Sequence, residues 1–256
     1  MADRRVAGGL QTVAAAFDLL DCFVEQEELG VTEVSRLLGI PKSSAHRLLT
    51  SLASRGIVEQ NHHNAKYRLG VRLYELGNLA GSRINLRRSA QGPLEELRET
   101  VGWTVQLSVP SGVDSLVLER LQTVRSLNAL PEFRRRLPLH LTAQGKALCA
   151  YNPALAEAPL RAGLPAMTPG SITSPARFRR ELEQIRRAGY SVAGEEAVDA
   201  VAGVGAPILD VRGEAIAAVS IIGVPGDILP AASRLGRFAL GAARRIQRNL
   251  RTGTQL

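Results

Sequence analysis

The chain has 256 residues, a formal net charge of +8, and hydrophobic residues at 45% of its composition. This length suits one large domain or two smaller ones, and this composition excludes wholesale disorder. No apolar run approaches the roughly 18–20 residues that cross a bilayer. Two cysteines are too few for a disulfide scaffold or a four-thiolate zinc site. The N-terminal residues do not resemble a secretory signal, so we expect a cytoplasmic protein without a metal or cofactor.

The positive charge is concentrated in one segment. Residues 36–72 carry seven Lys and Arg side chains against Glu59 alone, whereas residues 18–33 carry six acidic side chains and no basic one. A total charge is weak evidence for a partner, but a local excess on one surface favours contact with nucleic acid.

The first stretch with helical periodicity covers residues 10–25. Its apolar side chains recur at intervals of three and four, which predicts one amphipathic helix with a single buried stripe. Gly30 ends the segment. The stripe that we expect to be buried consists of Val13, Phe17, Leu20 and Val24.

A short helix, a tight turn and a longer helix follow. Thr32 stands where an N-cap residue belongs, so it predicts a short helix that runs through Leu38. Residues 39–41, Gly-Ile-Pro, predict a turn into another helix that extends to about Ser54. Residues 57–69 then predict a β-hairpin.

The helix that starts near Lys42 has two chemically different faces. Ala45, Leu48, Leu49 and Leu52 form the face expected to be buried, and the opposite face carries hydroxyl, imidazole and guanidinium groups without a carboxylate. Such groups reach base edges or phosphates when a helix lies in the major groove, as in a helix-turn-helix domain. We predict DNA contacts from Lys42, Ser43, Ser44, His46, Arg47 and Thr50 on this helix, and from Lys66 and Arg68 on the hairpin.

Residues 71–88 form a further helical segment with a narrow apolar seam, typical of a helix that packs against one partner. We expect this helix to end before Gly92 and Pro93, where we place the domain boundary. The expected organisation is a winged helix-turn-helix domain at residues 1–70, a linker and dimerisation helix at 71–88, and a second domain at 89–256.

The rest of the chain alternates between segments with helical periodicity and segments with strand periodicity. The mixed order, with strands in hairpin-like pairs, favours an α+β domain over a doubly wound parallel sheet. The last helix carries Leu235, Phe238, Ala242 and Ile246 on one side, which we expect to be buried. Helices are expected at residues 94–101, 142–151, 175–188 and 230–250, and strands at 104–109, 115–121, 190–192, 204–209 and 215–222.

Residues 32–49, TEVSRLLGIPKSSAHRLL, and residues 67–70, YRLG, resemble the IclR family of bacterial transcription regulators. The resemblance implies a winged helix, a linker helix that helps dimerise, and a GAF-like α+β domain that binds a small effector. It also implies dimers that pair into tetramers on DNA. Matching segments of the second half, in the same order and spacing, lie at residues 137–140, 145–147, 187–190 and 205–207.

The resemblance also implies an effector pocket, in which three positions depart from the commoner family pattern. Ala193 replaces an Asp, Gly203 replaces a Cys, and Ile222 replaces the second Ser of a Ser-x-Ser pair. Each change removes a polar group or adds room, so we expect a larger, partly apolar or aromatic acid. A pocket that repacks and responds weakly is the alternative. The implied pocket residues are Ala143, Gln144, Ala193, Val201, Gly203, Ser220 and Ile222.

Enzyme and metal motifs are incomplete. Gly145-Lys146 lacks the rest of a phosphate-binding loop, and Gly203-Val204-Gly205 lacks the third glycine of a dinucleotide fingerprint. We interpret His62-His63 as a solvated hairpin tip and Cys149 as a small core residue. We interpret Glu195-Glu196 as a charge cluster on a loop.

The sequence therefore predicts a ligand-responsive regulator that binds a pseudo-palindromic operator in double-stranded DNA as a two-fold dimer, and not an enzyme. Two alternatives stay open. One is a small-molecule sensor whose basic N-terminal module docks a protein partner, and the other is an enzyme built on the C-terminal α+β domain.

Overall fold

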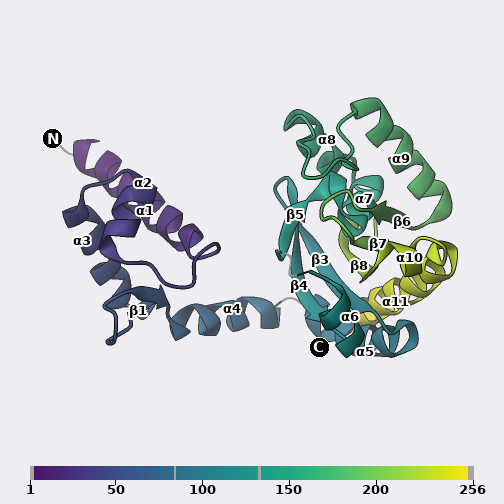
Figure 1. Ribbon diagram of the computed structural model, residues 1–256, viewed down its shortest axis with the longest axis horizontal. Helices are drawn as coiled ribbons and strands as arrows, with labels where there is room; N and C mark the ends of the chain where they lie inside the picture. The colour runs from purple at the N-terminus through teal and green to yellow at the C-terminus, as the bar shows by residue number, and fades with distance from the viewer. Residues whose placement is uncertain (1–2, 84, 132–133, 253–256) are drawn as a thin grey trace. The chain divides into compact units, whose positions relative to one another are not determined.

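The computed structural model describes residues 3–83, 85–131 and 134–252. The chain divides into two compact units, Met1–Arg83 and Ile84–Leu256, which are drawn together in Figure 1. Within the described ranges, no helix is both long enough and apolar enough to cross a membrane.

The N-terminal unit is a winged helix-turn-helix domain, as predicted. Its elements are α1 (Asp3–Cys22), α2 (Val31–Leu38), α3 (Lys42–Ala53), β1 (Val58–Gln60), β2 (Tyr67–Leu69) and α4 (Val71–Arg83). The small core gathers buried side chains from every element between α1 and β2, among them Leu19, Val34, Leu49 and Tyr67. The hairpin strands pair antiparallel, with Val58 opposite Leu69.

The stripe predicted on the first helix is wrong. Val13 and Phe17 are exposed at 54% and 64%, whereas Leu19 and Phe23 are the side chains in the core. The residues of α1 carry apolar groups on two neighbouring stripes, and spacing alone does not choose between them. Among the α1 residues whose burial is described, Leu19 is fully buried and Leu20, from the predicted stripe, is partly buried against the same core.

The predicted N-cap at Thr32 is also wrong by two positions. Helix α2 begins at Val31 with Gly30 as its cap residue. The Gly30 amide donates to Glu33 Oε2 at 2.6 Å, so the third helical residue satisfies the backbone donor of the cap position.

The C-terminal unit is built on one antiparallel sheet of six strands in the order β5-β4-β3-β8-β7-β6, which confirms the α+β class. The strands are β3 (Thr104–Ser111), β4 (Asp114–Leu121), β5 (Arg136–Pro138), β6 (Ser191–Gly194), β7 (Ala202–Leu209) and β8 (Ala215–Gly223). The helices are α5 (Asn85–Val101), α6 (Val124–Ala129), the 3-10 turn η1 (Leu139–Leu141), α7 (Ala143–Tyr151), α8 (Pro153–Arg161), α9 (Pro175–Ala188), α10 (Pro225–Ile228) and α11 (Ala232–Thr252). The short elements α6 and β5 lie outside the predicted ones, since each is too brief to show a clear period. Helix α8 was also missed, and it carries Pro159 inside it, which usually argues against a helix.

Helices cover both faces of this sheet (Figure 1). On one face α5 and α11 pack against side chains such as Val105 and Ile221, and on the other α7, α8 and α9 pack near Ala218. On α11, Phe238 is 40% exposed although we predicted it to be buried, and Ala239 takes its place in the core. Because both faces are covered, side chains in the middle of the sheet are buried, whether polar or apolar.

The helix predicted at 71–88 ends earlier, at Arg83, and the helix predicted at 94–101 begins earlier and runs through Gly92. Helix α5 runs from Asn85 to Val101 with Pro93 inside it. A proline cannot donate to the carbonyl four residues earlier, which here belongs to Ser89. The side chain of Asn249 on α11 donates to that carbonyl instead, at 2.9 Å.

Candidate nucleic-acid interface and ligand cavity

The turn between α2 and α3 is fixed by two hydrogen bonds of one serine. Helix α2 ends at Gly39, whose φ of 64° lies in the left-handed region that favours glycine. Ser35 Oγ donates to the Ile40 carbonyl at 2.7 Å, and the Ile40 amide donates to the Ser35 carbonyl at 3.1 Å. Pro41 then precedes the first turn of α3. One side-chain and one backbone hydrogen bond thereby tie the end of α2 to the residue before Pro41.

The two faces of α3 lie as predicted. Ala45 and Leu49 are fully buried, and Leu48 and Leu52 are partly buried against them. Thr50 Oγ1 donates to the His46 carbonyl at 2.8 Å, so only its oxygen lone pairs are left for a donor on another molecule. The exposed residues of the outer face are Ser43, Ser44, His46, Arg47 and Thr50.

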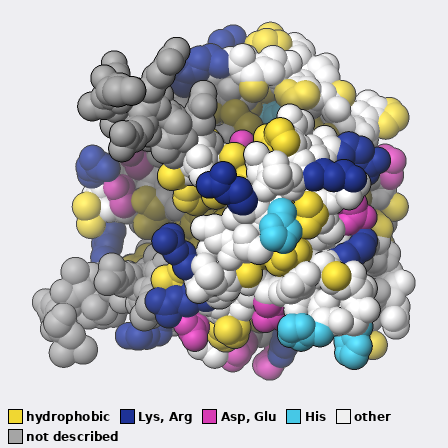
Figure 2. All heavy atoms as spheres, turned by 90° about the vertical axis from the view of Figure 1, so that its left-hand side faces the viewer, with side chains coloured by type: hydrophobic (Ala, Val, Ile, Leu, Met, Phe, Trp, Pro, Cys, Tyr) yellow, Lys and Arg dark blue, Asp and Glu magenta, His cyan; other side chains and the backbone are white. Residues whose placement is uncertain are grey.

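Two cations on α3 differ from those on the hairpin. Within the described part of the chain, Lys42 and Arg47 are exposed and have no carboxylate within ion-pair distance. Figure 2 looks onto the side of the N-terminal unit and shows Lys, Arg and His side chains across the middle of the view. Unpaired cations on one helix face are suited to phosphate or guanine contacts.

The predicted cations of the hairpin are paired. Lys66 Nζ lies 3.0 Å from Glu33 Oε1, and Arg68 Nε lies 2.6 Å from Glu59 Oε1. The Gly30 amide and the Lys66 ammonium hold the pKa of the Glu33 carboxyl below its usual value. Exposed pairs of this kind contribute little to stability and exchange readily with other anions. Of the cations predicted to contact DNA, those without a carboxylate partner among the described residues are therefore Lys42 and Arg47 on α3.

The C-terminal unit holds a cavity of about 40 Å³ between the sheet and the start of α7. Six of the seven residues predicted for the effector pocket line it. The exception is Ser220, which is buried on β8 opposite Gln106 and does not line the cavity. The six are Ala143, Gln144, Ala193, Val201, Gly203 and Ile222.

The first turn of α7 forms one wall of this cavity and is held tightly against β7. Thr142 caps the helix through its hydroxyl, which accepts from the Gly145 amide at 3.1 Å. Gly205 leaves no room for a side chain, because a Cβ there would lie 2.6 Å from the Ala143 carbonyl oxygen. Ser191 Oγ also donates to that oxygen. The N-terminus of a helix favours negative charge, so this wall suits a carboxylate.

Gln106 lines the cavity, although nothing in the sequence marked it as a site residue. Its side chain is fully buried, and both amide atoms have no hydrogen-bond partner among the described residues. Thr104 and Ser108, on the same face of β3, are equally buried with unpartnered hydroxyls. The alternation of polar and apolar residues in this strand is typical of a sheet with one solvated face. Here the polar side chains of β3 face the interior of the domain. They are buried because helices cover both faces of the sheet.

The room expected from glycine at position 203 is already filled. A Cβ at Gly203 would lie 2.8 Å from Ile222 Cδ1. The isoleucine therefore occupies the space that a larger residue at 203 would take. Gly203 and Ile222 are therefore sterically coupled, and both contribute apolar surface to the wall of the cavity.

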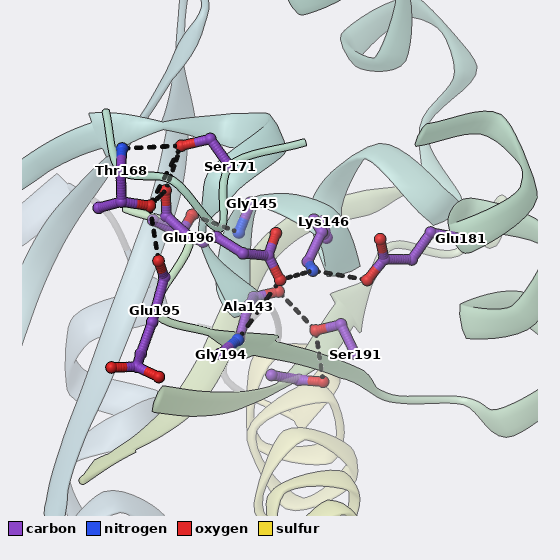
Figure 3. A network of polar contacts seen from close by, with 12 residues as sticks. Ala143, Gly145, Lys146, Thr168, Ser171, Glu181, Ser191, Gly194, Glu195 and Glu196 are labelled. Carbon is purple, nitrogen blue, oxygen red and sulfur yellow. Dashed lines mark hydrogen bonds and ion pairs between the residues drawn. The ribbon is translucent and has the colours of Figure 1, made fainter. Parts of the chain in front are cut away.

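Glu196 is not a solvated loop charge, contrary to our interpretation. It is 7% exposed, and its Oε1 accepts from Lys146 Nζ at 2.7 Å (Figure 3). Lys146 is fully buried and donates also to Glu181 Oε1 at 2.6 Å. Burial raises the pKa of the Glu196 carboxyl, while the neighbouring Lys146 ammonium opposes that rise. Its Oε2 has no partner among the described residues.

The segment 195–201 between β6 and β7, which we call the cavity loop, forms another wall of the cavity and is tied to α7 by the contact between Glu196 and Lys146. Glu196, Ala197, Val198 and Val201 line the cavity from this loop. Its start is fixed by Thr168 and Ser171, whose hydroxyls donate to the backbone carbonyls of residues 195 and 196 (Figure 3).

Comparison with known proteins identifies relatives of both units. Residues 12–62 match the IclR helix-turn-helix domain, and residues 79–248 match the bacterial transcriptional regulator IclR C-terminal domain. The chain is 36% identical over 218 residues to the HTH-type transcriptional regulator XynR of Escherichia coli (strain K12), covering 83% of this chain and 85% of that protein. It is 32% identical over 219 residues to BhcR of Paracoccus denitrificans, with coverage of 85% and 78%.

Solved structures agree with these matches. An IclR homolog from Microbacterium hydrocarbonoxydans, complexed with 4-hydroxybenzoate, superposes with a TM-score of 0.83 at 30% identity, over 94% of this chain and 99% of that one. The IclR of Thermotoga maritima gives a TM-score of 0.70 at 29% identity, over 93% and 99%.

Proposed function

Because the chain belongs to the IclR family of bacterial transcriptional regulators, we propose that α3 reads an operator and that a small acid in the cavity beside α7 controls this binding. The protein is an IclR-type regulator with a DNA-binding helix-turn-helix domain and an effector-binding C-terminal domain. The exposed face of α3 and the lining of the cavity supply the residues for these two roles.

The DNA contacts are assigned to the outer face of α3. Arg47 and His46 reach base edges, Ser43, Ser44 and Thr50 add shorter contacts, and Lys42 binds a phosphate near the start of the helix. Two copies of the chain read a pseudo-palindromic operator, with residues 71–88 setting the spacing of the two heads. Lys66 and Arg68 reach phosphates by exchanging their carboxylate partners.

The effector is a small aromatic or otherwise partly apolar carboxylic acid. Its carboxylate lies at the N-terminus of α7, and its apolar body packs against Ile222, Val201 and neighbouring alanines. One observation carries this proposal: Gln106, fully buried at the cavity, has no partner for either amide atom among the described residues. Such groups are costly to leave unpaired, so the site is built for a ligand with polar atoms.

The size of the cavity limits the ligand in its present form. A cavity of about 40 Å³ exceeds the ~10–15 Å³ that a single water needs. An aromatic ring requires the cavity loop to move outward, since the α7 wall cannot shift without breaking its contact with Gly205. A ring of the 4-hydroxybenzoate type, the ligand of the Microbacterium homolog, is our first candidate.

The C-terminal domain acts as a sensor and not as a catalyst in this proposal. Lys146 is held by two carboxylates, and burial raises the pKa of the Cys149 thiol to about 12, so neither side chain is an activated nucleophile. A sensor that docks a protein partner through α3 is the competing function. The outward cations Lys42 and Arg47 favour DNA over that alternative.

Two measurements test the proposal on the full-length protein. Fluorescence anisotropy with DNA from the promoter of the protein's own gene should show binding that falls steeply with salt, and Arg47→Ala should remove the preference for that sequence over scrambled DNA. The exposed Arg187 on α9 is the matched control, and Arg187→Ala should bind normally. An Arg47→Ala variant with intact preference contradicts the assignment of the reading face.

The second measurement is thermal shift with benzoate, 4-hydroxybenzoate and glyoxylate. Stabilisation by the aromatic acids, and its loss in Gln106→Met, supports the cavity as the effector site. Stabilisation by glyoxylate alone contradicts the apolar character that we assign to it.

A further inference from the structure

A buried ion cluster lies directly beside the cavity. Lys146 contributes one positive charge, and Glu181 and Glu196 contribute two carboxylates at 2.6 and 2.7 Å from its Nζ. Both the lysine and Glu196 are almost completely buried. Among the described residues, no other charged side chain lies within ion-pair distance of Lys146 Nζ.

Resting on the proposed function of the cavity, we infer that Glu196 recognises a hydroxyl group of the effector, so that the preferred ligands are hydroxylated carboxylic acids. The carboxyl group of the ligand would lie at the N-terminus of α7, and the hydroxyl would lie at the cavity loop and donate to Glu196 Oε2.

The geometry of Glu196 leaves one oxygen for a ligand. Its Oε1 is occupied by Lys146 Nζ at 2.7 Å and by the Gly194 amide at 3.4 Å. Its Oε2 is buried, has no partner among the described residues, and belongs to a side chain that lines the cavity. Lys146 holds the carboxylate in this orientation, while Glu181 sits on α9 and does not line the cavity.

The cavity wall carries three buried acceptor atoms that have no partner among the described residues: Glu196 Oε2, Gln144 Oε1 and Gln106 Oε1. A carboxylate oxygen only accepts, so it needs a donor that the ligand must bring. A simple acid has no such donor once it is ionised, but a hydroxy acid has one.

A hydroxyl fits this wall better than an ammonium group. The Lys146 ammonium already lies on Glu196 Oε1 and repels a second cation at the neighbouring oxygen. The remaining wall is built from Ala193, Ala197, Val198 and Leu141, and burying a full positive charge among such side chains is costly. A neutral hydroxyl satisfies Oε2 without that cost.

The contact also joins the ligand to the cavity loop. Glu196 belongs to the cavity loop, and its backbone carbonyl accepts from Ser171 Oγ at 2.7 Å. A ligand that contacts both the N-terminus of α7 and Glu196 therefore holds the helix and the loop together.

The test compares four matched acids by isothermal titration on the full-length protein: benzoate, 4-methoxybenzoate, 4-hydroxybenzoate and 4-(aminomethyl)benzoate. Methoxybenzoate keeps the oxygen but lacks the donor. We expect 4-hydroxybenzoate to bind about tenfold or more tightly than benzoate or the methoxy acid, the scale of a hydrogen bond to a charged group. In Glu196→Gln this preference should fall to about twofold or less, while benzoate affinity stays within about threefold.

Glu181→Gln is the matched control, because it removes the other partner of Lys146 without touching the cavity, and it should keep the hydroxyl preference. Circular dichroism shows whether both variants fold. If Glu196→Gln does not fold, the four-acid series on the unaltered protein tests the inference. Equal binding of the hydroxy, methoxy and unsubstituted acids overturns the inference but leaves the effector cavity standing. Strongest binding of the aminomethyl acid also overturns it, and binding of none of the four overturns the inference together with our aromatic-acid assignment.

Discussion

Asn249 of α11 donates a 2.9 Å hydrogen bond to the carbonyl oxygen of Ser89, the group on α5 that Pro93 deprives of its intrahelical donor. A side chain about 160 positions along the chain thus repairs the defect that a proline makes inside a helix. This explains why α5 continues where the sequence signal predicts a break.

If the Asn249 hydrogen bond compensates for Pro93, replacing Pro93 should restore the stability that is lost when Asn249 is replaced. Asn249→Ala should lower the free energy of unfolding by about 1 kcal/mol, because the Ser89 carbonyl loses its partner. Adding Pro93→Ala restores an amide donor inside the helix, so the double variant should recover that loss. Urea unfolding of the four proteins measures the coupling. Additive effects of the two substitutions would show that the hydrogen bond does not depend on the proline.

The contact between Gly203 and Ile222 predicts a second coupled pair. Gly203→Ala places a methyl group 2.8 Å from Ile222 Cδ1 and should lower the free energy of unfolding by about 1–2 kcal/mol. Ile222→Val removes the clashing carbon, so in that background Gly203→Ala should be nearly neutral. Gly226→Ala is the control, since no atom lies within 4 Å of its Cβ position. A Gly203→Ala cost that is the same in both backgrounds would refute the coupling.

His140 predicts a loss of stability on mild acidification. Its Nε2 donates to the Pro165 carbonyl at 3.0 Å, its Nδ1 is buried without a partner among the described residues, and burial lowers the pKa of the imidazole. The unfolded chain therefore takes up a proton at a higher pH than the folded one. The stabilisation is complete above the unfolded pKa of about 6.5 and is lost as the pH falls towards the folded pKa.

The size of this effect is at most about 1.4 kcal/mol per pH unit inside that window. His140→Gln keeps a donor for Pro165 but does not titrate, so its free energy of unfolding should fall less between pH 7.5 and pH 5. Glu196, whose pKa is raised, acts in the opposite direction but is present in both proteins and cancels in the comparison. Parallel pH profiles for the two proteins would argue against a buried neutral imidazole.

The two thiols should differ in reactivity. Burial raises the pKa of Cys149 to about 12, whereas Cys22 is only partly buried and its pKa is raised by burial and by Asp21 and Asp18. At pH 8, iodoacetamide should alkylate Cys22 slowly in the native protein and should reach Cys149 only in denaturant. Peptide mapping by mass spectrometry measures both rates. Labelling of native Cys149 as fast as Cys22 would show that this region opens.

The N-terminal unit was largely predictable because its elements are local. The two faces of α3 follow directly from the spacing of Ala45, Leu49 and Arg47, and the turn is signalled by Gly39 and Pro41. The buried side of α1 was not predictable, since Leu19 and Phe17 are both apolar and only packing against α2 separates them.

The cavity was predictable only where the family resemblance supplied positions. Neither Gln106 nor Glu196 has a local signal, because a polar residue in a strand or loop is ordinarily solvated. Their burial depends on helices that cover the second face of the sheet and on Lys146, which is fully buried in α7. The pairing of residues 50 positions apart is a property of the assembled fold.

The tight seat of α7 on Gly205 makes the two ends of the cavity mechanically unequal. On our proposal the carboxylate of the effector lies at the start of α7, which Gly205 holds in place, so enlargement of the cavity falls on the cavity loop. A series of acids should therefore show steep intolerance to change at the carboxyl group and gradual tolerance to added length at the hydroxyl end. Selection for a new effector would accordingly act first on residues 195–201 and leave the start of α7 untouched.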